Sequence, residues 1–73
     1  ISRIAVLPEW RRRGVASRII AALEAEAARM GLTHVSLHAQ IYVRKLYEKR
    51  GYEVSGPPFI EAGIDHVPML KKL

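Results

Sequence analysis

The sequence predicts a mixed α/β domain, of the α+β kind, with its elements in the order β-α-β-α-β-β. Three observations support this order. An apolar run at residues 3–7 suits a buried strand, a helical pattern covers residues 13–30, and polar and apolar residues alternate at residues 34–39. Strand, long helix and strand form a right-handed βαβ unit, so we expect the two strands to be parallel. Their carboxyl ends then share one sheet edge, where open α/β sheets bind ligands.

The length and composition of the chain restrict its class. Its 73 residues form at most one small domain, and we expect a single unit over residues 1–73. Because it has no cysteine, neither a disulfide nor a thiolate metal site can stabilise it. No apolar run approaches the roughly 18 residues of a membrane span, and no signal-peptide pattern occurs, so we expect a soluble, cytoplasmic protein. The chain opens at Ile1, directly at a strand, as the interior of a longer protein would.

The charge balance favours an anionic partner. Twelve Lys and Arg residues against seven Asp and Glu give a net charge of +5. Three of the arginines are consecutive, at residues 11–13, and the chain has only one Trp, one Phe and three Tyr. Localised charge and sparse aromatic residues favour a phosphorylated small molecule over a nucleic acid.

The helix at residues 13–30 is expected to pack one apolar stripe against the sheet, formed by Ala16, Ile19, Ile20, Leu23, Ala27 and Met30. Arg18, Glu24 and Arg29 lie away from the centre of that stripe, and Gly31 suits a left-handed C-terminal cap.

The second half of the chain predicts a shorter helix at residues 41–50, with Val43, Leu46 and Tyr47 facing inward and Gly51 as its end. A short strand at residues 52–54 and a last strand at residues 66–70 follow. Residues 59–65 fit either the end of a strand or a loop.

A phosphate site is expected where the first strand meets the first helix. Pro8 ends the strand, and the three arginines lead into Gly14 at the start of the helix. The first turn of a helix carries backbone N–H groups without intrahelical partners, and the helix dipole adds partial positive charge there. Such an end is well suited to bind phosphate.

These residues also support a resemblance to a family. The run Arg11-Arg12-Arg13-Gly14-Val15-Ala16 resembles the Arg/Gln-x-x-Gly-x-Gly/Ala signature of the GNAT superfamily of acetyl-CoA-dependent N-acetyltransferases. A second match, Leu46-Tyr47-Glu48-Lys49-Arg50-Gly51-Tyr52, is similar to the family's Leu-Tyr-x-x-x-Gly-Phe/Tyr segment. Seven residues before the tyrosine the family usually has asparagine, whereas this chain has Gln40. The resemblance implies the C-terminal half of a GNAT-type sheet with two flanking helices.

The resemblance also implies roles for residues. Acetyl-CoA would be held by Ala5, Val6, Arg11, Arg12, Arg13, Gly14, Val15, Ala16, Ser17 and Gln40, with the pyrophosphate on the backbone N–H groups of the loop and the pantetheine arm along the first strand. Tyr47 would be the general acid that protonates the leaving thiolate. Without the resemblance, Tyr47 fits an aromatic core residue and the arginines fit a solvated basic turn.

The three histidines lack metal-ligand spacing, so we expect no metal site. His38 fits a base or a pocket-lining residue, but a structural histidine is the simpler interpretation. Residues 59–69 are similar to the Glu-Ala-Gly-Ile-x-His ending of an ElaA-like bacterial branch of the GNAT superfamily, which Gln40 also suits. That similarity makes Glu61 and His66 candidates for the acceptor side, without assigned roles.

The resulting hypothesis is an N-acetyltransferase that transfers acetyl from acetyl-CoA to a primary amine by direct attack. A non-catalytic CoA-binding or assembly module is the alternative, and a basic nucleic-acid-binding domain is less favoured. The N-terminal strands and helices of the family fold are absent from the 73 residues. We therefore expect the free edge of the first strand to be filled either by those residues or by a second copy of the chain.

Overall fold

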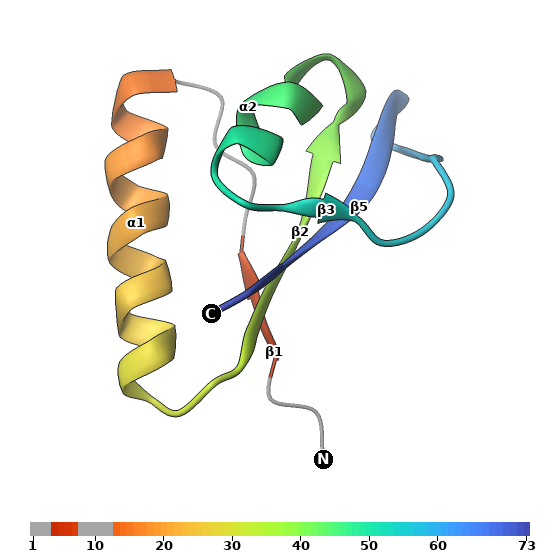
Figure 1. The fold of residues 1–73 in the computed structure, drawn as a ribbon. Coiled ribbons are helices and arrows are strands. Elements are labelled where there is room, and N and C mark those ends of the chain that lie inside the picture. Colours follow the sequence, from red (N-terminus) through yellow and green to blue (C-terminus); the bar gives the residue numbers. More distant parts are fainter. Residues whose placement is uncertain (1–3, 8–12) are drawn as a thin grey trace.

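The computed structural model, which describes residues 4–7 and 13–73, has the predicted order of strands and helices with one further strand after the second helix (Figure 1). The elements are β1 (Ile4–Leu7), α1 (Arg13–Arg29), β2 (His34–Gln40), a 3-10 turn (Ile41–Val43), α2 (Arg44–Lys49), β3 (Glu53–Val54), β4 (Phe59–Glu61) and β5 (Ile64–Lys72). The mixed α+β fold class is confirmed. The segment that the sequence left ambiguous forms β4 and the start of β5.

The strands form one sheet in the order β1-β2-β5-β3, and β4 pairs with the N-terminal part of β5. β1 and β2 are parallel, as the βαβ pattern predicts, and the other pairs are antiparallel. The register of the parallel pair runs from Ile4 beside His34 to Leu7 beside Leu37. β2 continues for three residues beyond that point, paired with β5 on its other side.

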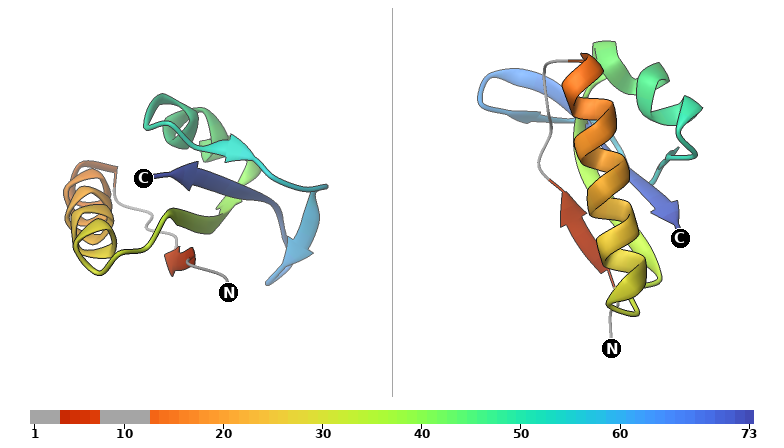
Figure 2. Two further views of the ribbon diagram at one scale, coloured as in Figure 1. Left: turned by 60° about the horizontal axis from the view of Figure 1, so that its bottom comes forward. Right: turned by 90° about the vertical axis from the view of Figure 1, so that its left-hand side faces the viewer.

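Both helices pack against one face of the sheet (Figure 2). The alternating residues Val35, Leu37 and Ala39 of β2 are completely buried, as predicted, and they share a core cluster with Ile20 and Ala27 of α1 and Tyr47 of α2. The opposite face is open among the described residues: Val6 is 72% exposed, and its neighbour Ser36 on β2 is only partly buried. His38, one of the functional residues predicted on β2, alternates with these core residues and is exposed on this open face, whereas Gln40 at the end of the strand is buried.

Two predictions for α1 are wrong. Met30 is 66% exposed, because the helix ends at Arg29 and the chain turns away before the apolar stripe reaches it. Glu24, placed away from the stripe, is only 9% exposed. Helical spacing puts Glu24 beside Ile20 and Ala27 on the buried face, where a carboxylate is retained only if it finds partners.

The three partners of Glu24 come from two other segments. The Tyr52 hydroxyl donates a 2.6 Å hydrogen bond to Oε2 of Glu24, and Nζ of Lys71 on β5 lies 3.2 Å from Oε1. The guanidinium of Arg50, just after α2, lies 3.6 Å from the same oxygen. Lys71 also sits 5.6 Å from the centroid of the Tyr52 ring. The carboxylate thus joins α1 to the end of α2 and to the last strand.

Both helices end in the same way. Gly31 and Gly51 have positive φ angles of 82° and 94°. After α1, Leu32 N donates to Ala27 O and Gly31 N to Ala28 O; after α2, Tyr52 N donates to Tyr47 O and Gly51 N to Glu48 O. This is the Schellman arrangement, in which only glycine fits the left-handed position without strain. The second cap brings Tyr52 back against Tyr47, with their rings 5.8 Å apart and edge-to-face.

A tight hairpin joins β4 to β5. Ala62 and Gly63 both have positive φ angles, of 53° and 74°, which is the geometry of a two-residue type I′ turn. The pairing sets Phe59 beside His66 and Glu61 beside Ile64. The hairpin therefore brings Glu61 onto the open face of the sheet, next to the carboxyl end of β2.

We expect Glu24→Ala to lower the free energy of unfolding by about 3 kcal/mol, because it leaves a buried phenol and two cations without their anion. Glu24→Gln should cost less, since the amide oxygen still accepts from Tyr52. Urea denaturation measures both. The control is Glu26→Ala on the same helix, whose ion pair with Arg29 is exposed and should be worth less than about 0.5 kcal/mol. Equal effects at positions 24 and 26 would contradict the role of the buried carboxylate.

A second prediction concerns alkaline pH. Burial, followed by the hydrogen bond to Glu24 and its negative charge, raises the pKa of the Tyr52 phenol well above its usual range. The unfolded chain loses this proton near pH 10 while the folded chain keeps it. The stabilisation is therefore complete below about pH 10 and is lost at higher pH, by up to about 1.4 kcal/mol per pH unit.

Urea denaturation at several pH values measures this loss of stability. Tyr52→Phe should make the dependence above pH 10 shallower, whereas Tyr42→Phe, at a ring that is 73% exposed, should leave it as it is. If the free energy of unfolding falls with pH equally in the wild-type chain and in Tyr52→Phe, the Tyr52 phenol does not contribute to the pH dependence of stability.

Candidate functional site

Three elements meet at one end of the molecule, the upper end in Figure 1. The N-terminal end of α1 lies there, together with the carboxyl end of β2 and the 3-10 turn that leads into α2. The described part of the parallel ladder runs to Leu7 beside Leu37, and β2 continues from there to His38 and Gln40. This is the sheet edge at which the βαβ pattern predicts a ligand.

The predicted phosphate loop is only partly within the described residues. Arg11 and Arg12 lie outside them. Arg13 is the first residue of α1, and Gly14, Val15, Ala16 and Ser17 continue its first turns. The first turn of α1 contains no acidic residue. Because the first N–H groups of any helix lack intrahelical partners, phosphate binding by the backbone here stays a prediction.

Ala5 and Val6, proposed for the pantetheine arm, belong to β1 and pair with Val35 and Ser36. Gln40 is the last residue of β2 and is 2% exposed. Tyr47 is 1% exposed and belongs to the core cluster, with its ring against Tyr52. The core position fits the interpretation of Tyr47 as an aromatic core residue. Tyr47 also belongs to the helix that follows the carboxyl end of β2, the sheet edge where a ligand is predicted.

The three candidate acceptor residues come together on the open face of the sheet. His38 Nδ1 lies 3.3 Å from Glu61 Oε2, and His66 Nε2 lies 3.9 Å from Glu61 Oε1. The His38 and Glu61 side chains are half exposed, whereas His66 is 5% exposed and its Nδ1 lies 2.7 Å from the Ile64 carbonyl oxygen. Residues from β2, β4 and β5 that are far apart in sequence thus form one cluster.

Phe59 is a member of this cluster that the sequence did not indicate as a site residue. Its ring meets His38 edge-to-face with centroids 4.8 Å apart, and it stacks on His66 at 5.9 Å. Period-two alternation from Phe59 to Glu61 would have placed both side chains on one face, had the segment been recognised as a strand.

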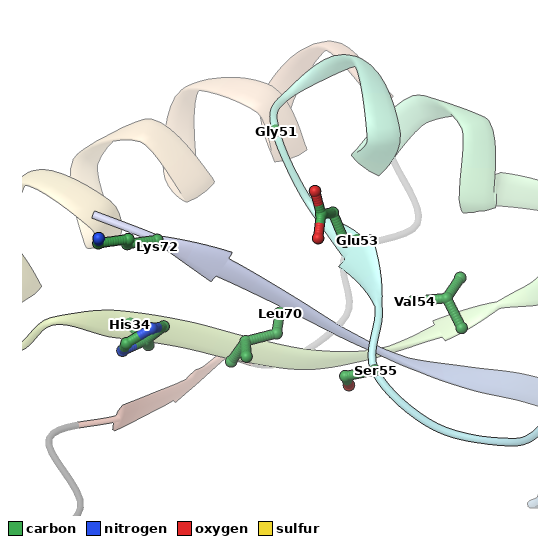
Figure 3. Close-up of a pocket in the computed structure, with 7 residues that line it drawn as sticks. All are labelled: His34, Gly51, Glu53, Val54, Ser55, Leu70 and Lys72. Carbon is green, nitrogen blue, oxygen red and sulfur yellow. The ribbon is translucent and has the colours of Figure 1, made fainter.

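The same face carries a hollow of about 530 Å³ at its other end, shown in Figure 3. It is lined by His34, Gly51, Glu53, Val54, Ser55, Leu70 and Lys72. None of the predicted site residues lines it. Elsewhere in residues 4–7 and 13–73, no three His, Asp or Glu side chains are grouped to hold a metal ion. No helix in the described part of the chain is long and apolar enough to span a membrane.

The sequence of the chain matches the model of one known protein family. The family model described as Acetyltransferase (GNAT) domain matches residues 1–73. The chain belongs to the GNAT acetyltransferase family. The resemblance found at the two sequence motifs is therefore confirmed at the level of the family.

Two proteins of Bacillus subtilis are similar to this chain. "Uncharacterized protein YyaT" of Bacillus subtilis is 37% identical over 73 residues, which cover 100% of this chain and 49% of the relative. "Uncharacterized N-acetyltransferase YjcF" of the same organism is 42% identical over 72 residues, covering 97% of this chain and 51% of the relative. The chain thus spans about half the length of these relatives.

A crystal structure of an acyl-CoA N-acyltransferase from Pseudomonas aeruginosa superposes with a TM-score of 0.76 at 26% identity. The match covers 82% of this chain and 41% of that one. The described residues therefore share the fold of about two fifths of that protein's length.

Proposed function

We propose that this chain provides the acetyl-CoA-binding half of an N-acetyltransferase. The observation that carries the proposal is the start of α1 at the carboxyl edge of two parallel strands, in a chain of the GNAT family. A helix start at such an edge offers backbone N–H groups to a pyrophosphate, and a gap between parallel strands can accept the pantetheine arm. Arg11, Arg12 and Arg13 add positive charge to the phosphate side.

In the proposed reaction, the acceptor is a primary amine that attacks the thioester carbonyl directly. A backbone N–H holds the developing oxyanion, and Tyr47 gives a proton to the departing sulfur. Two features support Tyr47: it lies on α2, which follows the second parallel strand, and its ring packs edge-to-face on Tyr52. Neither a metal nor a covalent enzyme intermediate is needed for this chemistry.

The proposed partner of the open sheet edge is the N-terminal half of the domain or a second copy of the chain. β1 ends the strand order, and Ile4 and Val6 are 43% and 72% exposed on the face without helices. An apolar edge strand of this kind invites pairing with another strand. The half-length match to the relatives favours the N-terminal half as the occupant.

The same half-length match supports the alternative of a CoA-binding module without turnover of its own. Both functions need the same cofactor site. They differ only in whether the acceptor is acetylated.

The cofactor site is tested by titrating the chain with acetyl-CoA in a calorimeter. Gly14→Glu should weaken binding by at least about tenfold, or about 1.4 kcal/mol, because it adds a side chain and a negative charge at the proposed phosphate site. Glutamate in the first turn favours a helix, so the loss cannot be ascribed to unfolding of α1. Ala25→Glu adds the same charge at an exposed position on the same helix and should bind as the wild type does. A folded wild-type chain that does not bind acetyl-CoA would refute the proposal.

The role of Tyr47 is tested by Tyr47→Phe, which keeps the ring against Tyr52 and removes the hydroxyl. We expect kcat to fall by about 10²–10⁴ with acetyl-CoA affinity changed less than about threefold. Release of free thiol from acetyl-CoA in the presence of an amine measures kcat. Unchanged turnover would exclude Tyr47 as the proton donor, and a wild-type chain that binds acetyl-CoA but acetylates no amine would favour the binding module.

A further inference from the structure

The cluster of His38, Phe59, Glu61 and His66 contains a histidine whose proton-accepting nitrogen is set by its neighbours. A carboxylate oxygen only accepts hydrogen bonds, so the 3.3 Å contact with Glu61 requires the proton of a neutral His38 to be on Nδ1. The lone pair is then on Nε2. The His38 side chain is 51% exposed, so the ring is accessible at the surface of the open face.

His66 is fixed in a different way. Its Nδ1 donates to the Ile64 carbonyl oxygen at 2.7 Å, and the side chain is 7% exposed. Its ring stacks on Phe59, which in turn meets the ring of His38 with its edge. His66 is therefore a buried residue against which Phe59 packs, whereas His38 is the accessible imidazole of the pair. Glu61 lies between them and contacts both.

The position of His38 in the sheet indicates what this cluster could do. His38 follows Leu37, the last residue of β2 whose partner on β1 is described. Its side chain faces away from the helices, because Leu37 and Ala39 on either side of it are in the helix-facing core. A cofactor held at the start of α1 and a group beside His38 would therefore approach the carboxyl end of β2 from opposite faces of the sheet.

We propose that His38 is the general base for the acceptor amine, that Glu61 is its positioning residue, and that the acceptor carries an apolar or aromatic group next to its amine. This inference rests on the proposed function and extends it to the acceptor. The carboxylate holds the imidazole with Nε2 toward the amine, and Phe59 offers the apolar surface beside it.

The proton and bond changes balance. The free amine forms a bond from nitrogen to the acetyl carbon and gives one proton to Nε2 of His38. The carbon–sulfur bond breaks, and the sulfur takes a proton from Tyr47. His38 returns its proton to water and Tyr47 regains one from water, so the products are the substituted acetamide and the free thiol of CoA.

The test uses the ¹⁵N-labelled 73-residue chain, with benzylamine as the probe and benzyl alcohol as its analogue without an amino group. Before any ligand is added, the ring nitrogen signals of His38 should report a proton on Nδ1, and Glu61→Ala should abolish this preference. Glu61→Asp should restore part of it, because a carboxylate is retained. An unchanged tautomer in Glu61→Ala would overturn the positioning role.

Benzylamine at pH 8 should shift the ring signals of His38, and benzyl alcohol should shift them several-fold less. His34→Gln is the matched control, since His34 is on the same strand and face but at its other end, beside Ile4. It should leave the response unchanged. His38→Gln should lower kcat for benzylamine by about 10²–10⁴ with acetyl-CoA affinity changed less than about twofold.

Two results overturn the proposal: ring signals that do not respond to benzylamine, or acetylation of benzylamine by His38→Gln at the wild-type rate. Calorimetry on the same samples separates this failure from failure of the proposed function. A chain that binds acetyl-CoA while His38 stays unresponsive loses only the acceptor assignment. A chain that does not bind acetyl-CoA loses the proposed function, and the acceptor assignment with it.

Discussion

The buried carboxylate of Glu24 is the contact on which the arrangement of the chain depends. It lies on α1 and is bonded to Tyr52 and Lys71, with Arg50 nearby, so it joins elements that are far apart in sequence. A domain of 73 residues has a small core and correspondingly little stability to lose. The contacts of a single buried anion with its three partners are therefore a large part of the total free energy of unfolding.

The same contact fixes the surroundings of the proposed proton donor. Tyr52 is held at its hydroxyl by Glu24 and at its backbone N–H by the Tyr47 carbonyl, and its ring packs on Tyr47. Tyr47 is thus held by the cap of its own helix and by a residue tied to the other helix. A proton donor needs a defined position more than it needs mobility, and this pairing supplies that position.

Much of the fold could be predicted because it follows from local patterns. The alternation of Val35, Leu37 and Ala39 specified the face that is buried, and the βαβ order specified the parallel pair. The burial of Glu24 could not be inferred in this way, since it depends on residues 26 to 47 positions away in the chain. Its partners compensate for the cost of removing a charge from water, and helical spacing alone does not reveal them.

The hairpin between β4 and β5 was missed for a related reason. A two-residue turn of this type usually contains Asn or Gly at its first position, whereas this chain has Ala62 in the left-handed conformation. Without the turn, Glu61 and His66 could be proposed only from family resemblance. Once the turn is known, strand alternation places them with His38 and also adds Phe59. The role of each remains a proposal.

The Glu24 contacts and the His38 cluster are separate in space, and this separation affects how such a protein can change over generations. The Glu24 contacts lie on the helix side of the sheet, and the His38 cluster lies on the other side, partly on a hairpin with an exposed turn. Substitutions in the hairpin can alter what is recognised there without disturbing the contacts that keep the chain folded. A lineage could therefore change the proposed acceptor site while keeping the proposed cofactor site and the same core.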